Sequence, residues 1–468
     1  MKSRMLLAAL VAGCAGDDVP AFDEPVGTLG RNVLVIIADD LGTDKVSAYG
    51  EHPDAPPTPN IDALAERGVL FRNAYAHPYG TATRASLMTG RHARRVGLGD
   101  ITYSSTPFEL PLAELTLAEL VALSPMLWDT AALGKWNLSG YHSEHAFAHP
   151  LYQGFRTHKG APANIESAML GDAGPRTYES WEKSIDGALE MTTVYATTDT
   201  TNDAIAEIAS MESPWLTVVS YNAPHAPVHV PPEHLRPDWL TADSDDIAKY
   251  DAAIWAMDQE IGRLFAEMGP DLLAETTVIF MADNGSDGEF VRPPLNEGHA
   301  KTTSFEGGIN VPMIVAGPWV DHPGSESQAL VQDIDLFATV AEIASVDVAD
   351  LERQDGSANP IDGRSLLPLL RDPSATIRDF AYTERFRPNG PPPYLSAREV
   401  VVTRQYKYVV EDAFWAESLF EIEGRTDDGP NLLADPHGLE DEAAAQLEIL
   451  RSNLQEIRSD TSYAGPGS

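Results

Sequence analysis

Four polar side chains directly follow two apolar segments of the sequence. Asp39 and Asp40 end one segment, and Asp283 and Asn284 end the other. Three carboxylates and one amide oxygen are the ligands that a hard divalent cation such as Ca²⁺ or Mg²⁺ prefers in proteins. Acidic residues also cap helices and fill turns, so the pattern taken alone favours no single role. If the four side chains converge, they predict a site for one divalent metal, with Ca²⁺ as first choice and Mg²⁺ or Mn²⁺ as alternatives.

The apolar segments must be strands if they are to bring these side chains to one edge of a sheet. Continuous apolar runs are typical of strands buried on both faces, and four such runs lie at residues 33–38, 216–221, 277–282 and 311–316. Thr58 followed by Pro59 predicts a helix start, and helical spacing of apolar residues predicts helices at 202–211 and 247–268. Alternating strands and helices predict a mostly parallel sheet, which binds ligands at the carboxyl ends of its strands.

The pattern changes beyond about Asp372. Short strands are predicted at 400–402, 406–410 and 419–422, and a closing helix carries apolar residues at helical spacing, namely Leu447, Leu450, Leu454 and Ile457. The predicted fold class is therefore α/β, with a large mixed, mostly parallel sheet sandwiched by helices and a small C-terminal α+β subdomain. The predicted organisation is a signal segment at 1–14, a flexible tether at 15–29, the large domain at 30–371 and the subdomain at 372–468.

The N-terminal segment predicts export. Lys2 and Arg4 precede a short apolar run at residues 5–11, and Cys14 follows. The run is too short to span a bilayer but suits the apolar part of an export signal. Residues 10–14 also resemble a bacterial lipoprotein box, in which the cysteine is lipidated, although a frayed N-terminus with a chance cysteine is the alternative. We expect a periplasmic or cell-envelope lipoprotein that meets the membrane through a lipid anchor at Cys14.

The charge balance restricts the partners of this chain. Acidic residues outnumber basic residues by 71 to 32, which gives a formal net charge of -39. This argues against a nucleic-acid partner, because contacts with phosphates need clustered lysines and arginines. The bulk of the negative charge indicates a solvated surface. An anionic substrate would be repelled at long range, so a local cluster of cations would have to bind it.

Short motifs along most of the chain resemble those of the sulfatase family, within the alkaline-phosphatase-like hydrolases. The similarity includes both segments that end in the candidate metal ligands, and it extends into the C-terminal subdomain. The motifs are VIIADDLG (35–42), TPNIDALA (58–65), RASLMTGR (84–91), GKW (134–136), NAPHAP (222–227), FMADNG (280–285), KTTSFEGG (301–308), RQYKY (404–408) and NLLADP (431–436). Each motif is weakly specific, but so many in the same order are specific.

The resemblance implies a hydrolase that acts on a sulfate ester of a small molecule or glycan, with a phosphate ester as runner-up. It assigns the metal ligands to Asp39, Asp40, Asp283 and Asn284. Cations must grip such an ester while its leaving oxygen gains negative charge, and Arg84, Lys135 and Lys301 could supply that grip. The resemblance places Lys301 and His225 against the ester, with His225 as general acid. Taken singly, each lysine could instead form a surface salt bridge, and His225 could be a turn residue.

The chain departs from the family pattern where the nucleophile should lie. In the family signature, a cysteine or serine four residues before the first arginine is converted to formylglycine, whose hydrated aldehyde attacks the ester. Counting back from Arg84, this position is Gly80, which has no side chain to oxidise, so no formylglycine is expected. Glycine at this position could simply permit a tight turn. A second departure is Asn137, where the family usually has a histidine that supports the nucleophile.

Three interpretations follow from the missing nucleophile. The protein could still be a hydrolase, with a metal-bound hydroxide in the space next to Gly80 or the Thr81 hydroxyl as nucleophile, although Thr81 is one position out of register. It could instead be a non-catalytic protein that binds sulfated ligands. Finally, the preserved residues could serve only the fold. The retained Lys135, His225 and Lys301 argue against the third interpretation, and the first is slightly favoured over the second.

Overall fold

The computed structural model describes residues 31–102, 107–167, 176–411, 416–424, 427–435 and 437–459. Cys14 and the predicted signal and tether segments therefore lie outside the described residues. Within the described ranges, no helix has the length and apolar character needed to cross a membrane.

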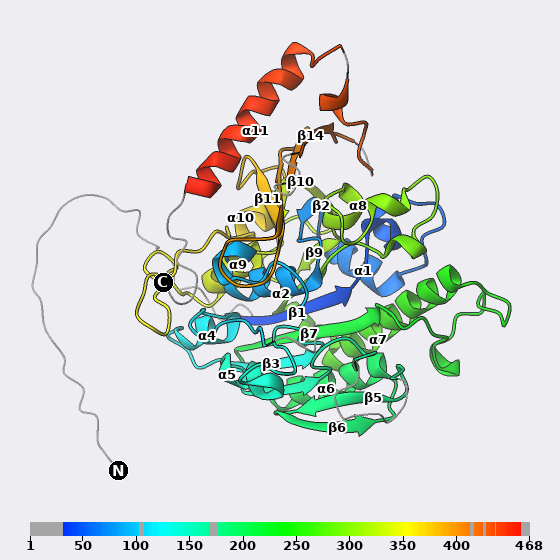
Figure 1. The fold of residues 1–468 in the computed structure, drawn as a ribbon. Helices are drawn as coiled ribbons and strands as arrows, with labels where there is room; N and C mark the ends of the chain where they lie inside the picture. Colours follow the sequence, from blue (N-terminus) through cyan, green and yellow to red (C-terminus); the bar gives the residue numbers. More distant parts are fainter. Residues whose placement is uncertain are drawn as a thin grey trace, which may run out of the picture.

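The centre of the fold is a ten-stranded sheet (Figure 1). Its strands lie in the order β10-β2-β9-β8-β1-β7-β3-β4-β5-β6, and only β9 and β5 run antiparallel to both of their neighbours. The bounds are β1 (Asn32–Asp39), β2 (Gly68–Tyr75), β3 (Asp129–Gly134), β4 (Thr157–Gly160), β5 (Trp181–Ile185), β6 (Ala188–Thr192), β7 (Trp215–Pro224), β8 (Thr276–Ala282), β9 (Met313–Ala316) and β10 (Ser325–Gln332). The mixed, mostly parallel sheet predicted from the sequence is confirmed.

Helices cover both faces of this sheet. One face is covered by α1 (Pro59–Arg67), α6 (Ala196–Ser210) and α7 (Asp246–Ala274), and α2 (Gly80–Thr89), α4 (Leu117–Ala122) and α9 (Asp335–Ile343) lie on the other side. Consecutive residues of β7 point to opposite faces of the sheet. Tyr221 bonds to Thr201 of α6 on one face, and Ser220 bonds to Arg84 of α2 on the other. The shorter helices are α3 (Ala93–Val96), α5 (His149–Tyr152), α8 (Glu306–Ile309) and α10 (Leu367–Arg371).

The four predicted buried strands are confirmed as β1, β7, β8 and β9. The last of them begins at Met313, directly after Pro312, which has no N–H to donate to a neighbouring strand. The predicted helix start at Pro59 is also correct, but the Thr58 hydroxyl caps no backbone N–H and instead donates to Asp62 at 2.9 Å. Strands β2 to β6 and β10 of this sheet were not predicted. In β2 and β10, polar residues interrupt the apolar runs.

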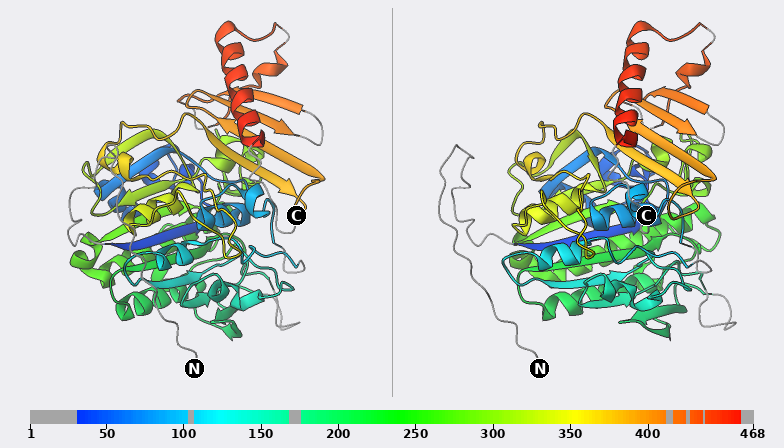
Figure 2. Two further views of the ribbon diagram at one scale, coloured as in Figure 1. Left: turned by 90° about the vertical axis from the view of Figure 1, so that its left-hand side faces the viewer. Right: turned by 60° about the vertical axis from the view of Figure 1, so that its left-hand side comes forward.

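A second, four-stranded antiparallel sheet forms the C-terminal unit, which stands on one side of the large domain (Figure 2). It consists of β11 (Ala381–Arg387), β12 (Ser396–Val402), β13 (Tyr406–Glu411) and β14 (Ala416–Glu421), followed by α11 (Asp441–Ser459). One face packs against α11, and Leu450 is completely buried there. The other face packs on the large domain, where Val400 lies near Tyr75. The small α+β unit predicted from the sequence is thus present, and residue 372 falls between α10 and β11.

Candidate active site

The four predicted metal ligands follow the carboxyl ends of two neighbouring strands. Strands β1 and β8 pair in parallel with Ala38 opposite Ala282, so Asp39 and Asp283 leave the sheet side by side. The backbone N–H of Asp40 donates to Oδ1 of Asp283 at 3.1 Å, and Nδ2 of Asn284 donates to Oδ1 of Asp40 at 2.8 Å. Asp40 has a φ of 68°, a left-handed conformation that aspartate tolerates and that turns the chain sharply out of the strand.

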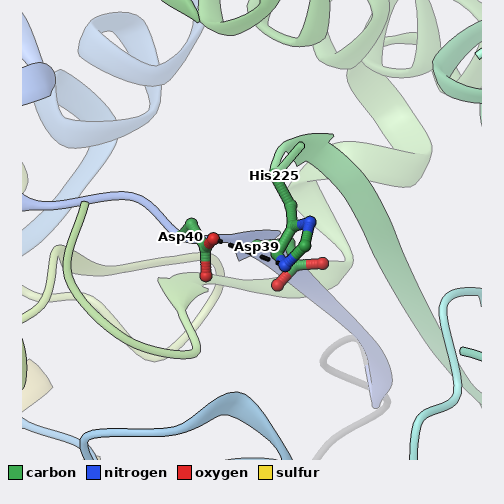
Figure 3. A group of neighbouring side chains, drawn as sticks. All are labelled: Asp39, Asp40 and His225. Carbon is green, nitrogen blue, oxygen red and sulfur yellow. Dashed lines mark ion pairs between the residues drawn. The ribbon is translucent and has the colours of Figure 1, made fainter. Parts of the chain in front are cut away.

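His225 approaches the same carboxylates from the end of β7 (Figure 3). One ligand atom from each of Asp39, Asp40 and His225 lies within 4.8 Å of the others, and Nε2 of His225 is 3.6 Å from Oδ2 of Asp40. The other ring nitrogen, Nδ1, is 2.8 Å from the carbonyl oxygen of Ala226. Because a carbonyl can only accept, Nδ1 carries a proton there, and Nε2 is the nitrogen free to exchange a proton at the site.

Each of the three carboxylates has a cation of its own. The ammonium of Lys135, just beyond β3, pairs with Asp39, and that of Lys301 lies 2.5 Å from Oδ2 of Asp40. These pairs connect residues 96 and 261 positions apart in the chain.

Arg84 on α2 forms the third pair, with Asp283. Its Nε donates to Oδ2 of Asp283 at 3.0 Å, and its Nη2 lies 2.9 Å from the same oxygen. The structure therefore brings all three predicted cations to the predicted ligand carboxylates.

The electrostatic balance differs among the three carboxyl groups. Burial raises the pKa of Asp39, but the charges of Lys135 and His225 outweigh burial and hold that pKa below its ordinary value. The pKa of Asp40 is likewise lowered, because Lys301 and His225 outweigh its burial. The pKa of Asp283 is raised by burial and by the negative charge of Asp39, against the effect of Arg84. Further positive charge at this place would allow all three groups to ionise together.

The donor set fits a hard divalent cation. Oδ1 of Asn284 is buried and has no hydrogen-bond partner among the described residues, which is costly unless another group coordinates it. It lies on the same side of Gly80 as the Asp283 carboxylate, and the amide nitrogen of the same side chain bonds to Asp40. Carboxylate and amide oxygens in this combination suit Ca²⁺ or Mg²⁺ better than softer metals.

Gly80 begins α2 with its Cα facing these ligands. A Cβ built on Gly80 would lie 2.1 Å from Oδ2 of Asp283 and 3.4 Å from Oδ1 of Asn284. The carboxylate of Asp283, held by Arg84, therefore lies where a side chain at position 80 would begin. Any larger residue at this position would have to displace that carboxylate.

The Thr81 hydroxyl is held away from the carboxylates by a different partner. Thr81 is 1% exposed, and its Oγ1 accepts a hydrogen bond from Nδ2 of Asn137 at 3.0 Å. The backbone N–H of Thr102 lies 3.5 Å from the same oxygen. Asn137 thus holds Thr81, and the proposed role of Thr81 as nucleophile stays a prediction.

Several residues that hold the site in place were missed in the sequence. The hydroxyl of Ser220, on β7, accepts from Arg84, and Tyr250 on α7 donates to the backbone carbonyl of Asp40. His77 bonds to Ser86, in the second half of α2, at 3.0 Å and so ties this helix to the segment before it. None of these residues belongs to a motif with chemistry of its own, so only their positions in space reveal them.

His158 on β4 lies behind the site and gives a testable pH dependence. It lines a small cavity with Arg84 and Lys135, and burial lowers its pKa to about 4. The unfolded chain binds this proton near pH 6.5, so it binds more protons than the folded chain between pH 6.5 and 4. Stability should therefore fall as the pH falls through this window, by up to about 1.4 kcal/mol per pH unit from this group.

Replacing His158 with phenylalanine is expected to flatten this part of the stability profile. Urea unfolding of the variant and the wild type at pH 7, 6, 5 and 4.5 measures the difference. The exposed His322 provides the control, because His322→Phe should leave the profile parallel to that of the wild type. A profile for His158→Phe that also runs parallel to the wild type would contradict a buried, neutral His158.

Comparison with known proteins gives consistent results. The sulfatase family model matches residues 31–346. The chain is 29% identical over 402 residues to N-acetylgalactosamine-6-sulfatase of Sus scrofa, covering 80% of this chain and 71% of the relative. It is 28% identical over 441 residues to arylsulfatase A of Homo sapiens, covering 86% of this chain and 77% of the relative.

Solved structures agree in fold. That of Ps i-CgsB in complex with k-i-k-neocarrahexaose has a TM-score of 0.74 at 23% identity, covering 92% of this chain and 93% of that one. The structure of BT4656 in complex with its substrate D-glucosamine-2-N,6-O-disulfate has a TM-score of 0.69 at 18% identity, covering 93% and 98%. The family match confirms the resemblance found in the motifs and supports sulfuric ester hydrolase activity. The chain belongs to the sulfatase family.

Proposed function

We propose that this protein is a metal-dependent hydrolase of sulfate esters that works without a formylglycine. The observation that carries the proposal is the convergence of Lys135, Lys301 and Arg84 on carboxylates at the strand ends, with His225 beside them. A fold has little need for so many cations at one buried edge. A sulfate ester needs them, because its sulfate oxygens are negatively charged and its leaving oxygen gains negative charge during the reaction.

Different residues of the site would bind the ester and transfer the proton. Lys135 and Lys301 would bind the sulfate oxygens, and Nε2 of His225, in its protonated form, would supply a proton to the leaving oxygen. The ligand set favours Ca²⁺, with Mg²⁺ or Mn²⁺ as alternatives, and a bound cation would stabilise negative charge on the ester.

Water is the proposed nucleophile, because Gly80 has no side chain and Asn137 holds the hydroxyl of Thr81. The water oxygen bonds to sulfur, and the bond from sulfur to the leaving oxygen breaks. The leaving oxygen takes its proton from His225, and the water releases a proton to solvent.

A second candidate is a binder of sulfated ligands that performs no chemistry. The position of the Asp283 carboxylate, 2.1 Å from where a Cβ of residue 80 would lie, favours it, since no nucleophilic side chain lies at this place. A phosphate mono- or diester, bound by the same cations, is the alternative substrate of the first candidate.

The deciding experiment is the hydrolysis of 4-nitrophenyl sulfate and 4-nitrophenyl phosphate by the purified protein with Ca²⁺, Mg²⁺ or Mn²⁺. We expect turnover of the sulfate ester that chelation of the metal abolishes. Faster turnover of the phosphate ester would make the protein a phosphoesterase. Millimolar or tighter binding of sulfate with no turnover of either ester would establish the non-catalytic binder.

We also propose that the protein is exported and anchored by lipid at Cys14, as its N-terminal sequence indicates. Its substrate would then be an external small-molecule or glycan sulfate ester. Labelling of the protein with a radioactive fatty acid in bacterial cells, and its loss in Cys14→Ser, would support the anchor. A wild-type protein that takes up no label would contradict the lipid anchor at Cys14.

A further inference from the structure

Two arginines of the small sheet lie directly opposite each other. Strands β11 and β12 pair antiparallel with Arg385 opposite Arg398. Like charges in this cross-strand arrangement are destabilising, because their side chains are held a few ångströms apart. The pair also lies in a chain with a net charge of -39, where carboxylates are far more abundant partners. Two positive charges held opposite each other form a place where an anion could bind both.

The guanidinium of Arg385 has N–H groups that no described residue accepts. It stacks over the ring of Tyr79 at 4.2 Å, and its nearest ion-pair partner, Asp100, is 3.6 Å away, beyond hydrogen-bond distance. It makes no hydrogen bond to any residue that the structure describes, and the side chain is 24% exposed. Its planar fork is therefore held in place by the ring while its N–H groups remain available to a ligand.

Arg398 is positioned beside it by another contact. It pairs with Glu411 on β13, and its side chain is 31% exposed. Burial and the charge of Arg385 lower the pKa of Arg398, which records the repulsion between the two groups. An anion placed between the two guanidinium groups would relieve that repulsion.

The two arginines lie where the small sheet contacts the segment that leads into the active site at Gly80. Tyr79, on which Arg385 stacks, directly precedes Gly80, whose Cα faces Asp283. Thr383, two residues before Arg385 on the same strand, donates to the carbonyl of Ala76 at 2.9 Å. Strand β11 therefore runs along the segment that leads into Gly80. The strands of the small sheet reach along the large domain in this way (Figure 2).

The same segment also contacts the residue next to Lys301, the proposed ester-binding cation. The backbone N–H of Thr302, next to Lys301, donates to the carbonyl of Pro78 at 3.1 Å. The residue pair 78–79 thus lies between the proposed ester site and the two arginines. A ligand that occupies both places must carry two anionic groups that are separated from each other.

We propose that Arg385 and Arg398 form a second anion subsite, which binds a sulfate or carboxylate group of a multiply anionic sugar whose reacting sulfate lies at Lys301. The inference rests on the proposed function, because it takes the Lys301 site as the place of reaction. Arginine suits this task, since its fork binds sulfate or carboxylate oxygens through two parallel hydrogen bonds. The preferred substrate is then a polyanionic glycan and not an isolated aryl sulfate.

Calorimetric titration at constant ionic strength tests the subsite. The probes are inorganic sulfate, galactose 6-sulfate, galactose 2,6-disulfate and a galactose 6-sulfate linked to glucuronate. Arg385→Gln and Arg398→Gln should each weaken binding of the two dianionic sugars at least tenfold, with binding of the first two probes unchanged. The disulfated sugar and the glucuronate probe together show whether sulfate or carboxylate is preferred.

A matched control is Arg67→Gln, since Arg67 also stacks over a ring, that of Phe265 at 5.7 Å, but lies at the opposite edge of the sheet. This variant should bind all four probes as the wild type does. Equal binding of one-anion and two-anion sugars by the wild type, or dianionic binding unchanged in both arginine variants, would overturn the subsite. Arg385-dependent binding of dianionic sugars with no binding of inorganic sulfate would keep the subsite and contradict the proposed function instead.

Discussion

Replacing Asp283 with asparagine is expected to abolish the stabilisation that a divalent cation gives to this protein. Asp283 is completely buried and lies beside Asp39, Asp40 and Asn284, so it supplies one of three carboxylates to the proposed metal site. A ligand that binds only the folded chain raises the free energy of unfolding by about 2.7 kcal/mol at a concentration of 100 Kd. The melting temperature of the wild type should therefore rise with Ca²⁺, and that of the variant should not.

The choice of asparagine limits damage to the fold. An alanine at position 283 would leave Arg84 buried without its main partner, which typically costs about 3–5 kcal/mol, whereas the asparagine amide oxygen can still accept from Arg84. Asp333→Asn is the matched control, because Asp333 is another buried aspartate but none of the metal-site contacts involves it. This control should show the full response to Ca²⁺. If the melting temperature of Asp283→Asn also rises fully with Ca²⁺, Asp283 is not a ligand of the metal.

Replacing Lys301 with alanine is expected to lower kcat/KM for the sulfate ester by about 10²–10³, the usual effect of removing one donor that stabilises developing charge. The ammonium of Lys301 lies 2.5 Å from Asp40, and its side chain is 14% exposed, so it can face both the metal site and an incoming ester. Burial would lower the pKa of Lys301, but Asp40 and Asp39 raise it, so the ammonium stays charged. Steady-state kinetics with 4-nitrophenyl sulfate measure the loss.

The same variant separates the ester site from a structural ion pair. Sulfate affinity, measured by calorimetry, should fall together with kcat/KM. The melting temperature in the absence of ligand should also fall, because the buried carboxylate of Asp40 loses its nearest cation, but the protein should stay folded. Lys249→Ala serves as the control, since Lys249 pairs with Asp246 on the surface of α7. Sulfate affinity at the wild-type level in Lys301→Ala would place the anion site elsewhere, whether or not the protein hydrolyses the ester.

The order of the motifs predicts that Gly80 lies where the family signature has the residue that becomes formylglycine. The Asp283 carboxylate, held by Arg84, lies closer to Gly80 than a Cβ at this position would permit. The same helix start keeps Thr81 bonded to Asn137, the other position that departs from the family pattern. Gly80 and Asn137 therefore lie at one corner of the site, whereas the sequence named them only as two separate positions.

The sequence by itself determined the elements that build the site. The continuous apolar runs before Asp39 and Asp283 are confirmed as β1 and β8. Such runs are typical of strands buried on both faces, and parallel neighbours end at the same edge. The ordered motifs predicted the family, and the matched family model confirms it. Strand β2 was missed because Arg72 and Asn73, which are both only partly buried, interrupt its apolar run.

Only the tertiary structure decided how the side chains pair. The sequence named Lys135 and Lys301 but could not say that the first meets Asp39 and the second Asp40, because contacts across 96 and 261 residues depend on strand order and register. It also gave no sign of the pair formed by Arg385 and Arg398, which exists because two antiparallel strands align at one register. Local patterns fix helices and strands, whereas packing of the whole chain fixes which charges face each other.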